Sequence, residues 1–184
     1  IDLGGEEGID TDLVLDEKVI DGQILRLNGS LFEIVHTPGH LSNHICISWK
    51  QKNIIFSGDH LMGWATTLIS PPDGDLGSFM KSLEKLALRK EEKYYPGHGK
   101  PIADPLAMVK AQLAHRRERE KQILNSLEEG SKKPAEIVDQ IYMDINPLLK
   151  KAALRNVLAH LIDLYERKAI YVKNFSIESY FEIV

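Results

Sequence analysis

The sequence predicts a mixed α/β (α+β) protein in which a sheet-rich segment precedes a helical one. Residues 23–57 consist of short apolar runs separated by turn residues, a pattern typical of antiparallel strands. Beyond Asp104 the apolar residues recur instead with helical spacing, and prolines stand where helices would open. The change in period predicts two domains, residues 1–104 and residues 105–184.

The first half contains four strand-like runs. Asn28 and Gly29 separate the first two, and this dipeptide indicates a hairpin because both central residues of a type I′ turn need positive φ. A second turn is predicted at residues 51–53. The runs are QILRL, LFEIVHT, HICISWK and NIIFSG.

A helix and a fifth strand complete this half. Asp75 is predicted to cap a helix whose apolar residues Phe79, Leu83 and Leu86 follow i, i+4, i+7 spacing. The run KYY then leads into PGHG, which places His98 just after the end of a strand.

The second half has the element order of a winged-helix module. Asp104 and Pro105 form a cap and a first helical residue, and the long helix that follows is expected to run to about Glu129. Two further helices open at Pro134 and Pro147, and the strand-like runs AIYV and YFEIV form a hairpin around residues 173–178. The residues expected to face inward are Ile137, Val138, Ile141, Leu154, Val157, Leu158, Leu161 and Leu164.

Composition limits the class of protein. With 184 residues, 43% of them hydrophobic, and a net charge of -4, the chain can form a core and is not expected to bind nucleic acid or acidic membranes through bulk charge. A single cysteine, Cys46, excludes an internal disulfide, is expected to be buried, and fits a cytoplasmic location. No apolar stretch approaches the ~18 residues of a membrane span. The chain does not begin with Met, so we expect it to begin partway into a longer protein.

Three polar residues share one local context. His40 in TPGH, Asp59 in FSGDH and His98 in YYPGHG each follow an apolar run and stand beside glycine. Residues at strand ends meet at one rim of a sheet, so two imidazoles and a carboxylate are expected to converge on a cation. Taken singly, His40 and His98 are more simply explained as exposed or backbone-bonded loop residues, and Asp59 as an Asx-turn or a helix cap; the repeated context favours the metal site.

The other histidines have less specific contexts. His44 is open to three interpretations: it orients the loop after His40, contacts a substrate in a catalytic role, or simply opens the next strand. His60 is equally open. His36, His115 and His160 fall within periodic runs and are predicted to be structural.

A family resemblance follows from these motifs. TPGHLSNH, IIFSGDHLMG and YYPGHG, in this order, resemble the second half of the metallo-β-lactamase superfamily domain. The added helices and hairpin resemble the winged-helix appendage of its β-lactamase-like-protein-2 subgroup. The resemblance covers residues 23–172 and implies the second half of an αββα sandwich. It also implies that His40 belongs to a first metal site, that Asp59 bridges two metals, and that His98 completes a second site.

One family motif is missing. The first-half signature HxHxDH, which supplies further metal ligands in the family, occurs nowhere in the chain. We therefore expect a truncated chain with an impaired site that binds one Zn²⁺ or none, held by His40, Asp59 and His98, instead of the family's two. One sheet face is expected to lie bare, to be covered by a partner, a second copy or an exchanged segment.

The resemblance implies a zinc-dependent hydrolase. In the family, metal-bound hydroxide attacks an ester, thioester, lactone or phosphodiester, and the residue matching Asp59 orients that hydroxide. We expect a small ester-type substrate, with residues 62–75 lining its pocket. Trp64 in this loop is either a stacking surface or a plug in the core.

A second class of function remains open. The chain is alternatively a non-catalytic winged-helix module that binds RNA, DNA or protein, or part of an endoribonuclease. Five basic residues of the second half would serve such a surface, although charges of this kind usually form a solvated helix face. They are Lys132, Lys133, Lys150, Lys151 and Arg155.

Overall fold

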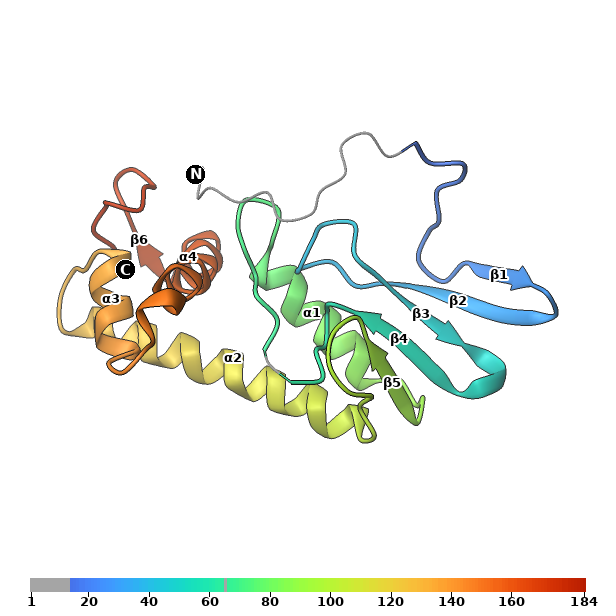
Figure 1. The fold of residues 1–184 in the computed structure, drawn as a ribbon. Helices are drawn as coiled ribbons and strands as arrows, with labels where there is room; N and C mark the ends of the chain where they lie inside the picture. Colours follow the sequence, from blue (N-terminus) through green and yellow to red (C-terminus); the bar gives the residue numbers. More distant parts are fainter. Residues whose placement is uncertain (1–13, 65) are drawn as a thin grey trace.

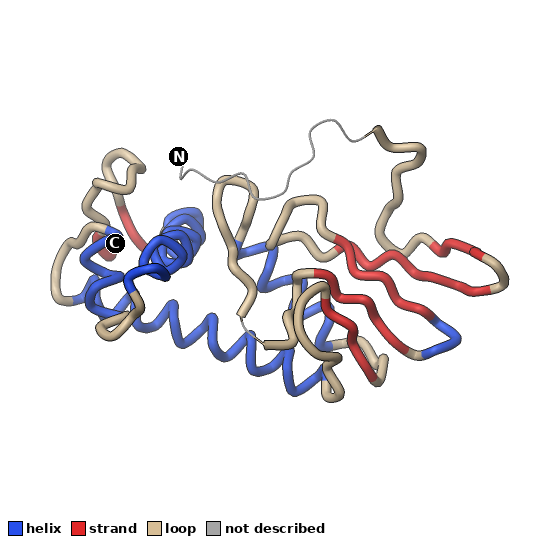
Figure 2. Tube along the Cα trace, viewed as in Figure 1, coloured by secondary structure: helices blue, strands red, loops and turns tan. Residues whose placement is uncertain are grey.

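The protein has a sheet at one end and a group of helices at the other (Figure 1). The structure is a computed structural model that describes residues 14–64 and 66–184. The first residues of the predicted first domain, 1–13, lie outside the described part. The predicted mixed α/β class is confirmed, and Figure 2 shows the strands of the first half gathered apart from the helices of the second half, beside which two short strands lie.

Five strands form one sheet in the order β1-β2-β3-β4-β5, with β1 to β4 antiparallel and β5 parallel to β4. The first hairpin is confirmed, since Asn28 and Gly29 both have positive φ, 48° and 79°. A 3₁₀ turn, Lys50–Lys52, makes the second connection. The strands are β1 (Ile24–Leu27), β2 (Ser30–His36), β3 (Ile45–Trp49), β4 (Ile54–Gly58) and β5 (Lys93–Pro96).

Helix α1 (Leu76–Ala87) makes the crossover that the parallel pair β4 and β5 requires. It begins where predicted, because the Asp75 carboxylate accepts a hydrogen bond from the Ser78 amide at 2.6 Å. Its residues Phe79, Leu83 and Leu86 are all buried, in a core shared with the sheet.

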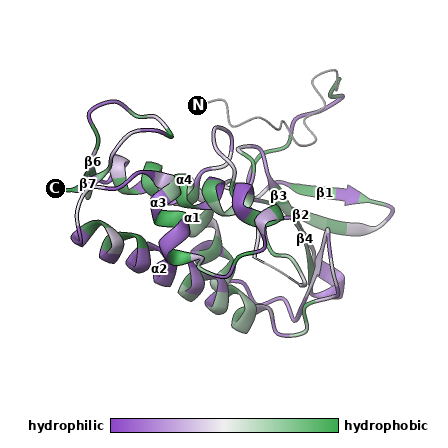
Figure 3. Cartoon of the chain, turned by 60° about the vertical axis from the view of Figure 1, so that its left-hand side comes forward, coloured by the Kyte–Doolittle hydropathy of each residue, from purple (hydrophilic) through white to green (hydrophobic). Residues whose placement is uncertain are grey.

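Helix α2 (Pro105–Glu128) contributes to two hydrophobic cores. Val109 and Leu113 pack into the core under the sheet, whereas Ile123 and Leu127 pack into the core of the helical half. Figure 3 shows both hydrophilic and hydrophobic residues along this helix. The boundary at residue 104 stays a prediction.

The helical half has the predicted order of helices and hairpin. After α2 come α3 (Pro134–Ile141), a 3₁₀ turn (Pro147–Leu149), α4 (Lys150–Glu166), β6 (Ile170–Tyr171) and β7 (Glu182–Ile183), the last two paired antiparallel. Of the residues expected to face inward, Ile141 and Leu154 are partly buried and the other six are buried. Within the described ranges, no helix is both long and apolar enough to cross a membrane.

The second face of the sheet is apolar and partly exposed. Cross-strand neighbours on it are Phe32 and Trp49, whose rings lie 5.3 Å apart, and Ile47 beside Phe56. Phe56 itself counts among the exposed large hydrophobic residues. The expectation that a partner or second copy covers this face stays a prediction.

His160 on α4 predicts an acid-sensitive fold. Its side chain is 1% exposed, and within the described chain neither ring nitrogen has a hydrogen-bond partner. Burial, with help from nearby Arg116, lowers its pKa from 6.5 to about 3. Between about pH 6.5 and pH 3, His160 therefore binds a proton in the unfolded chain but not in the folded chain. This one group costs about 1.4 kcal/mol of stability per pH unit as the pH falls from roughly 6 towards 3.

Urea denaturation of metal-free protein at pH 7.5 and pH 5.0 measures this effect. His160→Leu is expected to lose about 2 kcal/mol less than the wild type between the two values. The control is His36→Gln, at an exposed histidine. This variant is expected to lose as much unfolding free energy between the two pH values as the wild type does. An unchanged loss in His160→Leu would show that the buried imidazole is not a source of the acid sensitivity.

Candidate functional site

Sheet topology brings three predicted residues to one rim. Strand β2 is antiparallel to β3 and β3 to β4, so β2 and β4 point the same way, and β5 is parallel to β4. The carboxyl ends of all three strands therefore lie at the same end of the sheet. His40, Asp59 and His98 follow these ends, and the structure places the two histidines on either side of the carboxylate.

Each oxygen of Asp59 faces a different histidine. The distance from His40 Nε2 to Asp59 Oδ2 is 3.9 Å, and that from His98 Nε2 to Asp59 Oδ1 is 3.7 Å. Both are too long for hydrogen bonds. In the described part of the chain, no three His, Cys, Asp or Glu residues form a group that could hold one ion. The arrangement is thus two histidine–oxygen pairs on a shared carboxylate.

The ring of His40 is oriented for metal binding. Its Nδ1 lies 2.8 Å from the carbonyl oxygen of Leu68, and because a carbonyl only accepts, Nδ1 carries the proton. The lone pair is then on Nε2, the atom that faces Asp59. A backbone partner for the second ring nitrogen is the usual support of a metal-binding histidine. Imidazole and carboxylate together suit zinc or iron, so these residues fit a divalent metal.

The absence of a side chain at Gly97 makes room for the carboxylate of Asp59. A Cβ atom at this position would lie 2.6 Å from Asp59 Oδ1, which is closer than real Cβ contacts come. The Gly97 amide also donates to the carbonyl of Gly58 at 2.8 Å. The loop that carries His98 is thereby held against the end of β4.

His44 supports the main chain of Asp59. Its Nε2 accepts a hydrogen bond from the Asp59 amide at 3.2 Å, so Nδ1 donates to Thr37 Oγ1 at 2.9 Å. Burial lowers the pKa of His44 to about 4, which keeps the ring neutral. Thr37 Oγ1 in turn lies 3.3 Å from the sulfur of Cys46, which is buried as expected. A catalytic role for His44 stays a prediction.

His60 lies in the core instead of at the rim. Its ring is wholly buried, with its centroid 4.4 Å from that of Phe79, and its ring nitrogens have no hydrogen-bond partner within the described residues. Burial lowers its pKa to about 3. Its position indicates a packing role.

A buried arginine, not singled out in the sequence, supports the site from α2. The Arg116 guanidinium donates to Asn156 Oδ1 on α4 at 2.5 Å and to the carbonyl of Thr67. Thr67 Oγ1 donates to the carbonyl of Asp59 at 2.8 Å, so Thr67 links Arg116 to the main chain of Asp59 through two hydrogen bonds. Arg116 continues the helical spacing of Val109 and Leu113, and this was the one sequence signal for its burial.

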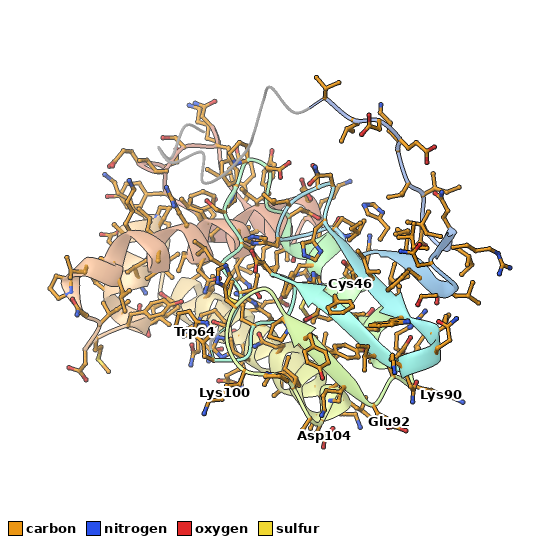
Figure 4. All side chains as sticks on the ribbon, turned by 45° about the vertical axis from the view of Figure 1, so that its right-hand side comes forward. Cys46, Trp64, Lys90, Glu92, Lys100 and Asp104 are labelled. Atoms are coloured by element: carbon orange, nitrogen blue, oxygen red, sulfur yellow. The ribbon has the colours of Figure 1, made fainter. Side chains whose placement is uncertain are left out.

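Trp64 is exposed, at 74%, so the interpretation as a core plug is wrong. Its indole lies against Gly99, where an added Cβ would be 2.6 Å from Cδ1. Figure 4 shows Trp64 on the same side of the molecule as Lys100, in the loop that follows His98. A stacking role stays a prediction.

Family models match both halves of the chain. The metallo-beta-lactamase superfamily model matches residues 3–98, and the beta-lactamase associated winged helix domain matches residues 134–170. The first match includes all three residues at the rim of the sheet.

Curated relatives extend the first match. The chain is 30% identical over 176 residues to the beta-lactamase-like protein 2 homolog of Drosophila melanogaster, covering 94% of this chain and 58% of the relative. It is 35% identical over 111 residues to an atrochrysone carboxyl ACP thioesterase of Claviceps purpurea (strain 20.1), covering 60% of this chain and 34% of the relative. The chain thus spans between a third and somewhat over half of these proteins.

Solved structures share the fold. A metallo-beta-lactamase family protein from Thermus thermophilus superposes with a TM-score of 0.77 at 24% identity, covering 90% of this chain and 54% of that one. A beta-lactamase domain protein from Burkholderia ambifaria gives 0.83 at 18% identity, covering 94% and 54%. Since the superfamily model also matches more than half of the sequence, the chain belongs to the metallo-beta-lactamase superfamily and carries that superfamily's associated winged-helix domain.

Proposed function

We propose that this chain carries part of the metal site of a zinc-dependent hydrolase that cleaves a small ester, with a thioester as the first candidate. The observation that supports it is the placement of His40 and His98 against different oxygens of Asp59. The thioesterase named among the relatives favours a thioester over a lactone or phosphodiester.

The residues divide into two donor pairs. His40 Nε2 with Asp59 Oδ2 would hold one ion, and His98 Nε2 with Asp59 Oδ1 would hold the other. A bound divalent ion polarises a carbonyl group and makes water nucleophilic at neutral pH. Two protein donors are fewer than the three or four usual for zinc, so each pair would need to be completed by water or by other residues.

The surrounding residues hold these donors in place. The Leu68 carbonyl fixes the proton of His40 on Nδ1, His44 accepts from the amide of Asp59, and Thr67 donates to its carbonyl. Burial raises the pKa of Cys46 to about 12, so its thiol is no nucleophile. We also propose that the protein is cytoplasmic, since a free buried thiol fits a reducing compartment.

Zinc binding by the purified chain tests the proposal. After zinc loading and dialysis, elemental analysis is expected to find metal in the wild type and at least about tenfold weaker binding in Asp59→Asn, because the amide loses the charge that both pairs share. Asp139→Asn, on the surface of α3 far along the chain, is the control and is expected to bind as the wild type does. Equal zinc in Asp59→Asn and wild type would exclude this site.

The nucleic-acid alternative receives less support from the charges. Lys133 lies 3.1 Å from Glu178, and Lys150 lies 2.8 Å from Asp139. Arg155 is only 7% exposed, so its side chain does not belong to a solvated face. Phosphate contacts would have to displace the acidic partners of both lysines, and we therefore prefer the hydrolase.

A further inference from the structure

A pocket lies between the helical half and the loop from β4 to α1, of which residues 59–64 and 66–75 are described and which we call the site loop. Its volume is about 470 Å³, within the size range of small-molecule sites, and it is lined by Trp64, by residues 66–68, and by residues of α2, α4 and the α3–α4 connection. The wall is largely apolar. Its lining side chains include Trp64, Leu68, Arg119, Tyr142, Ile145 and Leu149.

The apolar side of the pocket is open to solvent. Trp64 and Leu149 are both exposed large hydrophobic residues, and they line the same pocket although they stand 85 positions apart in the chain. Ile145 and Leu68 continue this wall. Exposed apolar side chains that gather around a hollow are more typical of a binding surface than of isolated surface residues.

Arg119 places one positive charge against this wall. Its guanidinium carbon lies 4.0 Å from the centroid of the Tyr142 ring, a cation–π contact that fixes its position. Its Nε is buried without an acceptor, and no carboxylate of the described residues forms an ion pair with it. The two arginines before it differ, since Arg116 is bonded to Asn156 and Arg117 to Glu84.

The pocket shares a wall with the metal-binding rim. Leu68 lines the pocket, and its carbonyl orients His40. Thr67 lines the pocket as well, and its hydroxyl donates to the carbonyl of Asp59. A molecule in this pocket therefore lies against the segment that supports the proposed site.

We propose that the pocket binds a small amphipathic anion, with its carboxylate or phosphate group against Arg119 and its apolar body against Trp64, Leu68 and Leu149. A guanidinium without a carboxylate partner offers paired N–H donors that match either acidic group. A substrate of this class would be an ester that also carries an acidic group, with its ester bond facing the rim. Only this placement of the ester bond rests on the proposed function.

Binding to metal-free protein tests the pocket separately from hydrolysis. Calorimetric titration with octanoate, octyl phosphate and octan-1-ol compares two acidic groups with a neutral one on the same chain length. At least one of the anions is expected to bind about tenfold or more tightly than octan-1-ol, and the stronger of the two identifies the acidic group.

Two variants assign the recognition to Arg119. Arg119→Met, which keeps the apolar stem, is expected to remove the preference for the anion while leaving octan-1-ol binding unchanged. Arg117→Met, on the exposed side of the same helix, is the matched control and is expected to keep the preference. Equal binding of anions and alcohol by the wild type, no measurable anion binding, or equal effects of the two variants would overturn the proposal. Loss of zinc binding in Asp59→Asn has no bearing on this result, so the two proposals fail independently.

Discussion

Replacing Gly39 with alanine is expected to destabilise the fold by about 3–4 kcal/mol. Gly39 has φ +136°, a conformation that residues with a side chain rarely adopt, and an added Cβ would lie 2.3 Å from the Cα of Phe79. The obstructing atoms belong largely to the backbone of α1, which cannot rotate away as a flexible side chain can. The residue that follows is His40, so the same substitution is expected to displace a predicted metal ligand.

Gly130 separates the two causes of that loss. Its φ is +134°, almost the value of Gly39, but among the described residues beyond Gly130 and its two chain neighbours no heavy atom lies within 4 Å of the position of an added Cβ. Gly130→Ala is therefore expected to cost only about 1 kcal/mol, from backbone strain alone. Urea denaturation of the wild type and both variants measures the difference. Equal losses would mean that the contact between Gly39 and α1 is not as tight as described.

Replacing Arg116 with leucine is expected to cost about 3 kcal/mol. The substitution leaves the buried Thr67 carbonyl without its donor, which costs roughly 1–3 kcal/mol, and it also removes the hydrogen bond to the half-buried Asn156 Oδ1. It also removes the cation from the Phe79 ring, whose centroid lies 5.3 Å from the guanidinium carbon. The removal of a buried charge offsets part of this loss, because burial already lowers the pKa of Arg116 to about 10.

Arg117→Leu is the matched control for this substitution. The Arg117 side chain is 65% exposed, and its ion pair with Glu84 is 3.4 Å long, so the change is expected to stay within about 0.5 kcal/mol. Thermal and urea denaturation of both variants at pH 7.5 give the comparison. A loss in Arg116→Leu no larger than that in Arg117→Leu would show that α2 does not hold the site loop through this residue.

The rim residues were predictable because the signals that place them are local. Asn28 and Gly29 specify the first hairpin, Asp75 specifies the start of α1, and glycine beside His40, Asp59 and His98 indicates where strands end. Once the strands are ordered, their directions follow from the short turns and the single crossover. The proximity of three residues far apart in the chain then follows from topology.

Arg116 and Arg119 were not predictable in the same way. Both stand in the run HRRERE of α2, and although helical spacing places Arg116 on the apolar face, no sequence pattern shows which groups these two arginines contact. What distinguishes them is the element facing each position: the Thr67 carbonyl and α4 for Arg116, and the Tyr142 ring for Arg119. Nor does any sequence pattern specify which oxygen of Asp59 faces which histidine, because side-chain torsions settle after the backbone loops have packed.

The sharing of α2 between two cores bears on how the molecule unfolds. A helix of 24 residues is about 36 Å long, and each of its halves is held by a different set of apolar residues. Melting of either core would leave half of this helix exposed and unsupported, so the sheet and the winged-helix portion are expected to lose structure in one cooperative step. The winged-helix portion is then expected to move with the sheet as one body, because the continuous helix α2 leaves no loop between the two cores to serve as a hinge.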